Sequence, residues 1–311
     1  MKYVPVLDKG FRPMYAEFKN YSAEVENSAN KTLKICVERN DGYNYIYEYK
    51  IFADKEKTDE NNRMAERIVK TILWLVGGYK IYIAGDENVY KFIKAAYTKE
   101  GIRAFDKGFM ERVYEKPFEV VLCDDKTFPA EKKCSLSVGG HLDGCRIGFD
   151  AGGSDRKVSA VIDGKVVYSE EVVWFPKINP DPDYHYNEIL TAFKTAASKM
   201  PRVDAIGVSS AGVYVNNKIM VASLFLKVSD EDFEKKVKTM YIDVAKEIGK
   251  DIPLEVANDG DVTALAGAID LNDDSVLGIA MGTSEAVGYI NKNGGLNGWL
   301  SELAFVPVDY N

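Results

Sequence analysis

Three polar turns in the second half of the chain carry residues that could bind a phosphorylated ligand. The first turn follows a short apolar stretch that ends in Asp150, and it contains Gly152, Gly153 and Ser154. Glycines let backbone amides approach a ligand closely, because no Cβ stands in the way. A carboxylate in front of such a turn suits a divalent cation that bridges to phosphate oxygens. An ordinary polar hairpin turn is the alternative, since glycine-rich turns are common.

The second turn combines an amide and a carboxylate. Asn258 and Asp259 follow an apolar strand predicted at 254–257 and precede a helix predicted at 262–269. A carboxylate at this point could accept the proton of an attacking hydroxyl, which is general base catalysis. It could equally be the N-cap of the helix, because Asp is a favoured N-cap residue in any protein.

The third turn contains Gly282 and Thr283 and ends a strand predicted at 276–281. All three turns therefore lie at the carboxyl end of a predicted strand, where open α/β sheets bind their ligands. Each turn alone is a weak signal. Their order along the chain predicts one shared site.

The elements that must position these turns are strands that alternate with helices. Residues 146–173 are predicted to form three strands joined by tight turns, followed by a proline-rich loop, a helix and a strand at 203–209. A similar order begins at residue 33, so the N-terminal region could be a degenerate copy of the same unit, although such an order is also a common way to build a sheet. A long helix is predicted to begin after Ser229, and residues 1–30 are predicted to be a loosely structured lead-in.

Composition excludes several classes of protein. The chain has 311 residues, 46% of them hydrophobic, which is enough for one large core or two. Its net charge is −8 and neither half is basic, which argues against a nucleic-acid partner. Four scattered cysteines and two histidines fit neither a disulfide framework nor a zinc site. The chain shows no membrane span and no secretory signal, so we expect a cytoplasmic protein without a membrane partner.

Taken together, the turns resemble the actin-like ATPase superfamily, and most of all the ROK family of bacterial sugar kinases and repressors. The likeness covers residues 146–311 and is carried by the segments GFDAGGS, EVANDGDVTALAG, GIAMGTSEAVGYINKNG and WLSELAF. It implies an α/β fold with actin-like ATPase (ribonuclease H-like) lobes, the first at 146–255 and the start of a second at 256–311. The second lobe would be incomplete, which implies a fragment of a longer protein. Residues 1–140 would form an N-terminal α/β region of unknown role.

The resemblance also implies a reaction, the ATP-dependent transfer of a phosphate to a hydroxyl of a hexose or related sugar. Asp259 would be the general base, and Asn258 and Glu302 would hold the sugar. Asp150 would organise Mg²⁺ through the phosphates. The phosphates would be held by residues of the two glycine turns, namely Gly152, Gly153, Ser154, Gly282 and Thr283. The partners would be a sugar and a nucleotide, and a homodimer is compatible with this reading.

The chain departs from the ROK pattern at several positions. Phe305 stands where the family has a histidine that reaches the sugar. Ser284 and Glu285 replace a glycine and a small apolar residue, and the zinc-binding cysteine cluster is absent. These departures leave two alternatives open. One is a non-catalytic sugar- or nucleotide-binding sensor or scaffold with the same fold, and the other is an N-acetyl-amino-sugar kinase-like ATPase.

Overall fold

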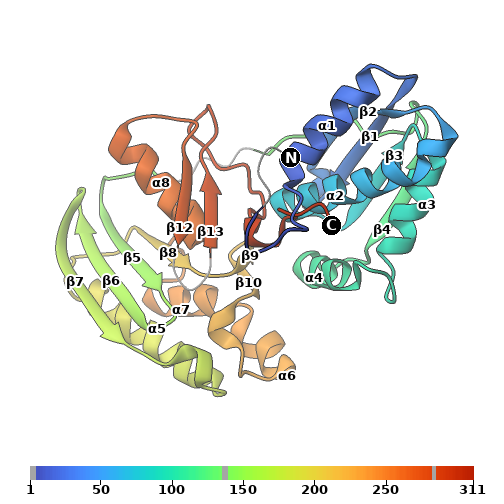
Figure 1. The fold of residues 1–311 in the computed structure, drawn as a ribbon. Coiled ribbons are helices and arrows are strands. Elements are labelled where there is room, and N and C mark those ends of the chain that lie inside the picture. Colours follow the sequence, from blue (N-terminus) through green and yellow to red (C-terminus); the bar gives the residue numbers. More distant parts are fainter. Residues whose placement is uncertain (1–4, 135–138, 282–284) are drawn as a thin grey trace. The chain divides into compact units, whose positions relative to one another are not determined.

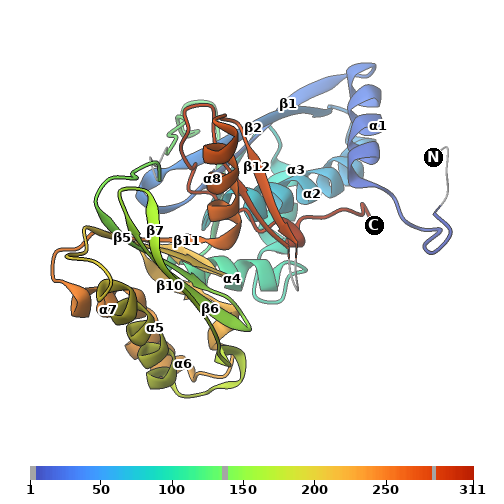
Figure 2. The same ribbon diagram turned by 90° about the vertical axis from the view of Figure 1, so that its left-hand side faces the viewer.

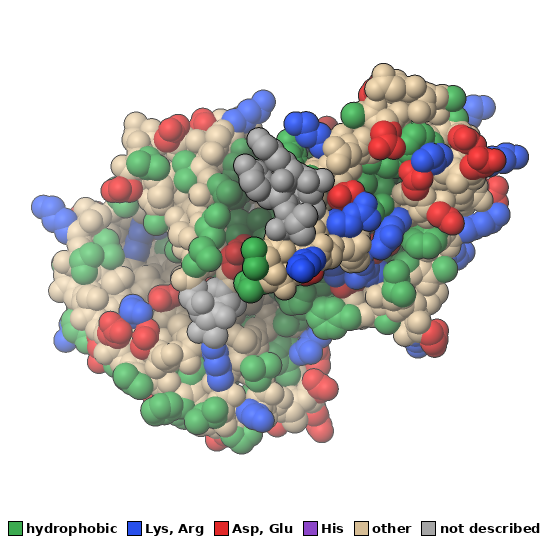
Figure 3. Space-filling model, viewed as in Figure 1, with side chains coloured by type: hydrophobic (Ala, Val, Ile, Leu, Met, Phe, Trp, Pro, Cys, Tyr) green, Lys and Arg blue, Asp and Glu red, His purple; other side chains and the backbone are tan. Residues whose placement is uncertain are grey.

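The chain forms two compact units in a computed structural model that describes residues 5–134, 139–281 and 285–311 (Figure 1). Unit 1 consists of Met1–Ser135 together with Gly298–Asn311, and unit 2 consists of Leu136–Asn297. The chain passes from unit 1 to unit 2 between residues 135 and 136 and returns to unit 1 between residues 297 and 298. On the face drawn in Figure 3, acidic and basic side chains are interspersed over the surface of each unit.

Unit 1 is built on a mixed four-stranded sheet in the order β2–β1–β3–β4. β1 pairs antiparallel with both β2 and β3, whereas β3 and β4 are parallel. The elements are α1 (Met14–Glu26), β1 (Asn30–Glu38), β2 (Asn44–Phe52), α2 (Thr58–Val76), β3 (Lys80–Ala84), α3 (Glu87–Ala96), α4 (Ala104–Tyr114) and β4 (Glu119–Cys123).

The sequence predicted part of unit 1 correctly. The order of hairpin, helix and strand that the sequence predicts from residue 33 onward is confirmed as β1 and β2, α2 and β3. The lead-in predicted at 1–30 is wrong for Met14–Glu26, because this stretch is the helix α1. Only Tyr21 and Val25 of α1 are buried, so its apolar residues show little helical periodicity.

The N-terminal sheet differs in topology from the sheet of unit 2. In unit 1 the strand that follows the helix, β3, runs antiparallel to the first strand, β1. In unit 2 the corresponding strand, β8 (Ala205–Ser210), runs parallel to β5 (Cys145–Ala151). The same order of hairpin, helix and strand therefore builds two different sheets, and unit 1 does not repeat the arrangement of unit 2.

The last segment of the chain belongs to unit 1. The backbone N–H groups of Leu300, Ser301 and Glu302 donate to the carbonyls of Val76, Leu75 and Trp74 at distances of 3.2, 2.9 and 3.0 Å. They thereby satisfy carbonyl groups in the last turn of α2, which have no partner within the helix. The sequence grouped residues 256–311 together, whereas the structure separates 298–311 from the rest of that stretch.

Unit 2 contains a five-stranded sheet in the order β11–β8–β5–β6–β7. β5, β8 and β11 are parallel, and β6 runs antiparallel to both of its neighbours. The helices α5 and α7 lie on one face of the sheet, and α8 lies on the other (Figure 2). The elements of this sheet and its helices are β5 (Cys145–Ala151), β6 (Asp155–Ile162), β7 (Lys165–Val173), α5 (Pro182–Ala197), β8 (Ala205–Ser210), α6 (Asp230–Asp232), α7 (Met240–Ile248), β11 (Leu254–Asn258) and α8 (Asp259–Leu271).

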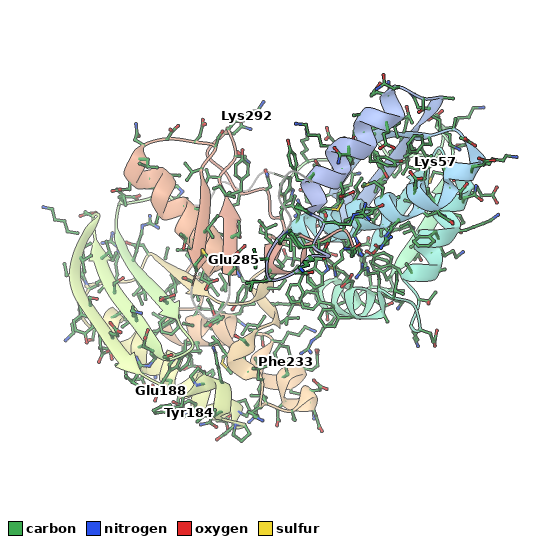
Figure 4. All side chains as sticks on the ribbon, viewed as in Figure 1. Lys57, Tyr184, Glu188, Phe233, Glu285 and Lys292 are labelled. Carbon is green, nitrogen blue, oxygen red and sulfur yellow. The ribbon has the colours of Figure 1, made fainter. Side chains whose placement is uncertain are left out.

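Two short hairpins complete unit 2. One joins β9 (Val213–Val215) to β10 (Lys218–Val221), and the other joins β12 (Leu277–Met281) to β13 (Glu285–Tyr289). Glu285, labelled in Figure 4, begins the last strand. The second hairpin packs against α8.

The core of unit 2 lies between the sheet and the α5–α7 layer. Alternate residues of β5 are buried on this side, as strand geometry requires. The long helix predicted after Ser229 begins as expected, because Ser229 Oγ accepts a hydrogen bond from the Asp232 N–H at 3.1 Å. A π-helical turn at Phe233–Val237 then interrupts it, and α7 begins only at Met240. The same apolar stripe is buried, but in two separate helical pieces.

The contact between α8 and its hairpin depends on glycine. A Cβ on Gly288 would lie 2.4 Å from both the Asp261 Cα and the Gly260 carbonyl oxygen. Both of these atoms are backbone, so a side chain at this position would have to displace the first turn of α8. The first turn of α8 carries Asp259, so this packing also fixes a candidate site residue.

Gly288→Ala is therefore expected to lower the free energy of unfolding by about 1–3 kcal/mol, the usual cost of overpacking. Gly267→Ala is the matched control, because a Cβ there would lie 3.6 Å from Val276 Cγ1, an ordinary contact. Gly267 is inside α8, where alanine is favoured by about 1 kcal/mol, so the control should be stabilised. Urea unfolding measures both variants. Equal stability of Gly288→Ala and the parent would contradict the close packing.

Candidate active site

The candidate site lies at the carboxyl ends of the three parallel strands of unit 2. β5 and β8 are in register so that Asp150 is opposite Ser209, and β8 and β11 place Ser210 opposite Asn258. Parallel neighbours end at the same edge of a sheet, so the first two predicted turns meet there. This is the edge at which open α/β sheets bind ligands.

The glycine turn between β5 and β6 is anchored by Trp174, which is almost completely buried. The indole Nε1–H donates to the Gly152 carbonyl at 2.7 Å, and the Trp174 backbone N–H donates to the Ser154 carbonyl at 3.1 Å. Two carbonyl groups of the turn are thereby tied to the protein. The backbone N–H groups of the turn are therefore the polar groups that remain available to a ligand.

Asp150 has only a distant cation partner. Lys157 Nζ lies 3.9 Å from the Asp150 carboxylate but 2.6 Å from that of Asp155, so it pairs mainly with Asp155. The Asp150 side chain is 44% exposed. Mg²⁺ is commonly held by one or two carboxylates together with substrate phosphates, and Asp150 fits that role. In the described parts of the chain, no cluster of three or more His, Cys, Asp or Glu side chains could hold a metal ion by itself.

Asn258 is the N-cap of α8. Its Oδ1 accepts from the Gly260 N–H at 2.7 Å, and its Nδ2 donates to the Gly212 carbonyl at 2.8 Å. The capping role that the sequence left open for Asp259 thus belongs to its neighbour. One N–H and one lone pair of the Asn258 amide remain for a ligand.

Asp259 lies in the first turn of α8 and is partly buried. Burial raises its pKa, and the charge of Asp150 adds to this effect, while the Gly260 N–H opposes it. Among the described residues, no lysine, arginine or histidine forms an ion pair with Asp259. A carboxylate without a cation partner and with a raised pKa is suited to accept a proton.

A cavity of about 520 Å³ opens between α8 and the face of the sheet on which α8 lies. Its wall includes a row of small residues in register across four strands, Ser169, Ser159, Gly148 and Gly207. The lining also includes Asp150 and Asp261, so the cavity reaches the carboxylate edge.

Asp261 was missed by the sequence reasoning. Burial, with the charge of Asp259 adding to it, raises the pKa of Asp261 to about 7. The sequence signal that could have identified Asp261 was its position in the first turn of the helix that follows Asn258. Asp261 is three residues after Asn258, so these two residues lie on the same side of the first turn.

The stability of unit 2 should depend on pH through Asp261. An aspartic acid in an unfolded chain ionises near pH ~4, whereas the folded-state pKa of Asp261 is about 7. Between these values the folded state keeps a proton that the unfolded chain releases, so the free energy of unfolding falls as pH rises. Asp261→Asn should therefore stabilise the protein at pH 8 on the order of 2–4 kcal/mol and hardly at all at pH 4.

Urea unfolding at the two pH values tests this prediction. Asp270→Asn removes an exposed carboxylate from the same helix and is the control that should leave the pH profile unchanged. A profile of Asp261→Asn that runs parallel to that of the parent would contradict the prediction.

The remaining predicted site residues lie elsewhere. Gly282 and Thr283 fall outside the described residues. Glu302 belongs to unit 1, and Phe305 stacks on Trp74 in the same unit, with ring centroids 4.2 Å apart. The structure therefore brings together Asp150, the glycine turn, Asn258 and Asp259, while Glu302 is assigned to the other unit.

Comparison with known proteins gives structural matches alone. No protein-family model and no curated protein sequence matches the chain. The similar solved structures include an inorganic polyphosphate/ATP-glucomannokinase from Arthrobacter sp. strain KM, with 22% identity and a TM-score of 0.39 over 50% of this chain and 61% of that chain. A ROK hexokinase from Thermus thermophilus matches with 16% identity and a TM-score of 0.39 over 51% and 50%.

A ROK family transcriptional regulator, a homologue of the E. coli MLC protein, matches with 17% identity and a TM-score of 0.36 over 50% and 38%. The chain spans between 38% and 61% of these three proteins. At such values the matches do not assign an activity. The strand order does decide the fold, because β7–β6–β5–β8–β11 with only β6 reversed is the order of a ribonuclease H-like lobe. Unit 2 has the ribonuclease H-like fold, on which the lobes of actin-like ATPases are built. Within the described residues, every helix is too short or too polar to cross a lipid bilayer.

Proposed function

We propose that the chain catalyses the transfer of the γ-phosphate of ATP to a hydroxyl of a hexose or related sugar. The observation that supports this most is Asp259, a partly buried carboxylate with a raised pKa and no ion pair among the described residues. It stands at the same sheet edge as Asp150 and the glycine turn. A base, a cation ligand and a phosphate turn at one edge are the groups that phosphoryl transfer needs.

In the proposed reaction, Asp259 accepts the proton of the sugar hydroxyl as the hydroxyl oxygen attacks the γ-phosphorus. The bond between the γ-phosphorus and the β,γ-bridging oxygen breaks, and ADP leaves with the electron pair. The turn at Gly152–Ser154 would hold phosphate oxygens through its amides, with Gly282 and Thr283 as further candidates. When bound at Asp150, Mg²⁺ would neutralise phosphate charge. Asn258 would orient the sugar through the free part of its amide, and Glu302 remains a second candidate for this role.

The test is direct. The 311-residue chain is incubated with ATP, Mg²⁺ and a panel of hexoses, amino sugars and N-acetyl-amino sugars, and phosphorylated sugar and ADP are measured together. We expect at least one sugar to be phosphorylated with one ADP released for each product. Sugar binding without any phosphorylation across the panel would overturn the proposal.

That outcome would favour the second candidate, a sugar- or nucleotide-binding sensor or scaffold. The observation in its favour is Phe305, which stands where the ROK family has a histidine and which packs on Trp74 instead. Phenylalanine cannot donate a hydrogen bond to a sugar hydroxyl. Calorimetry separates the candidates, because a sensor binds sugar with the same affinity whether or not nucleotide is present and turns nothing over.

A further inference from the structure

The loop that follows β7 lies directly over the glycine turn of the candidate site. Trp174 begins this loop and holds the carbonyls of Gly152 and Ser154, as described above. Lys177 follows three residues later. An ideal Cβ built on Gly153 would lie 2.7 Å from both the Cε and the Nζ of Lys177. The end of the lysine side chain therefore passes against the backbone of Gly153.

The loop that carries Lys177 is fixed from two sides. Trp174 anchors its start, and His185 of α5 anchors its middle. The His185 ring is fully buried, with Nε2 3.0 Å from the Pro176 carbonyl and Nδ1 3.0 Å from the Asp181 carbonyl. The residue next to Lys177 is thus held by a buried side chain. Such support fixes the backbone of the loop from which Lys177 extends.

The other cations near this turn already have partners. Lys157 pairs with Asp155 at 2.6 Å. Arg156 is buried and its Nε donates to Glu188 at 2.8 Å; Figure 4 labels Glu188 on α5. For Lys177, in contrast, no ion pair is found in the described part of the chain. Lys177 is therefore the lysine at this turn that is left for a ligand.

The turn itself offers matching groups. The carbonyls of Gly152 and Ser154 are bound by Trp174. The backbone amides of Gly152, Gly153 and Ser154 donate no hydrogen bond to any described residue. An ammonium group beside unpaired amides forms a site for an oxyanion, since both kinds of group are donors to phosphate oxygens.

We propose that Lys177 binds a phosphate oxygen of the nucleotide at the Gly152–Ser154 turn. The assignment rests on the proposed function, because it needs a phosphorylated ligand at this turn. Lys177 and the amides would bind the same polyphosphate chain, and Asp150, which precedes the turn, would hold the accompanying cation. The sequence motifs did not indicate this lysine, because it is 24 residues away from Gly153 and reaches the turn only through the fold.

Calorimetry with three probes tests the proposal: a non-hydrolysable ATP analogue with Mg²⁺, inorganic tripolyphosphate, and adenosine. Lys177→Gln should weaken binding of the first two probes about tenfold to a hundredfold, the usual effect of losing one charge-assisted hydrogen bond. Adenosine binding should not change. Because one phosphate contact is lost, binding of the ATP analogue should also depend less on salt concentration than in the parent.

Lys165→Gln is the matched control. It removes the same charge from the opposite end of β7, at the hairpin that follows Ile162, and should leave all three affinities unchanged. Equal affinity of Lys177→Gln and the parent for the ATP analogue would overturn the role of Lys177 while leaving the proposed transfer intact. If the parent binds the ATP analogue and Lys177→Gln loses this affinity, but the parent phosphorylates no sugar, the phosphate site would be supported and the transfer overturned. No binding of either phosphate probe by the parent would overturn both.

Discussion

Replacing Asp259 with asparagine should lower the rate of phosphate transfer to sugar about 10²–10⁴-fold, the range that a general base contributes. Asparagine has the same shape, and its Oδ1 can still accept the hydrogen bond that the Gly260 N–H gives to Asp259 at 3.1 Å. It cannot take up the proton of the attacking hydroxyl. Nucleotide affinity should therefore stay close to that of the parent, stability should not fall, and the loss should appear in kcat.

The pH profile provides a second readout for the same residue. Because burial raises the pKa of Asp259, the parent's rate should fall with decreasing pH at a higher pH than for an exposed aspartate. The pH profile of Asp259→Asn should lack this fall in rate at low pH. Asp270→Asn, an exposed carboxylate on the same helix, is the control and should keep full activity. Parental turnover by Asp259→Asn would show that the base is another group.

Replacing Glu66 with glutamine should lower the free energy of unfolding of unit 1 by about 3–5 kcal/mol, the cost of breaking a buried ion-pair network by removing one charge. Glu66 is 3% exposed and forms ion pairs with Arg67, at 3.1 Å, and with Arg103. Arg103 lies beside Asp106, a buried acid that pairs with Lys70 at 3.1 Å. Loss of the carboxylate leaves two guanidinium groups close together in an environment poor in water.

Glu60→Gln is the control on the same helix. Glu60 is exposed and pairs with Lys57 one turn away, and exposed pairs of this kind contribute about 0–1 kcal/mol. Urea unfolding monitored by tryptophan fluorescence measures both variants, since the buried Trp74 reports on unit 1. Equal free energies of unfolding for the two variants would show that the buried network contributes no more to stability than the exposed pair.

The sequence predicted best the features that depend on local chemistry. The glycine turn after Asp150 and the turn at Asn258 and Asp259 were placed correctly, because glycine and polar residues mark the ends of apolar strands. Parallel pairing of β5, β8 and β11 then brought these turns to one edge without further information. Lys177 could not be found in this way, since it reaches the turn only through the packing of a loop. Asp261 was missed although it lies in the same first turn of α8 as Asp259.

Features that depend on contacts between distant residues were predicted poorly. α1 gave no signal, because it buries only Tyr21 and Val25. The apolar stripe after Ser229 fits one long helix as well as it fits two shorter ones. The pattern of apolar residues therefore did not indicate the π-helical turn at Phe233–Val237. Strand direction in unit 1 is set by how the chain crosses the sheet between β1 and β3, which the order of elements does not determine.

The return of the last segment to unit 1 has a consequence for protein synthesis. Leu136–Asn297 is one unbroken stretch, so the ribosome has made all of unit 2 before it reaches Gly298. Until residues 300–302 follow, the carbonyls of Trp74, Leu75 and Val76 lack the donors that pair with them in the finished protein. Chains generally fold domain by domain as they are made. Here unit 2 is synthesised as one stretch before the segment that returns to unit 1.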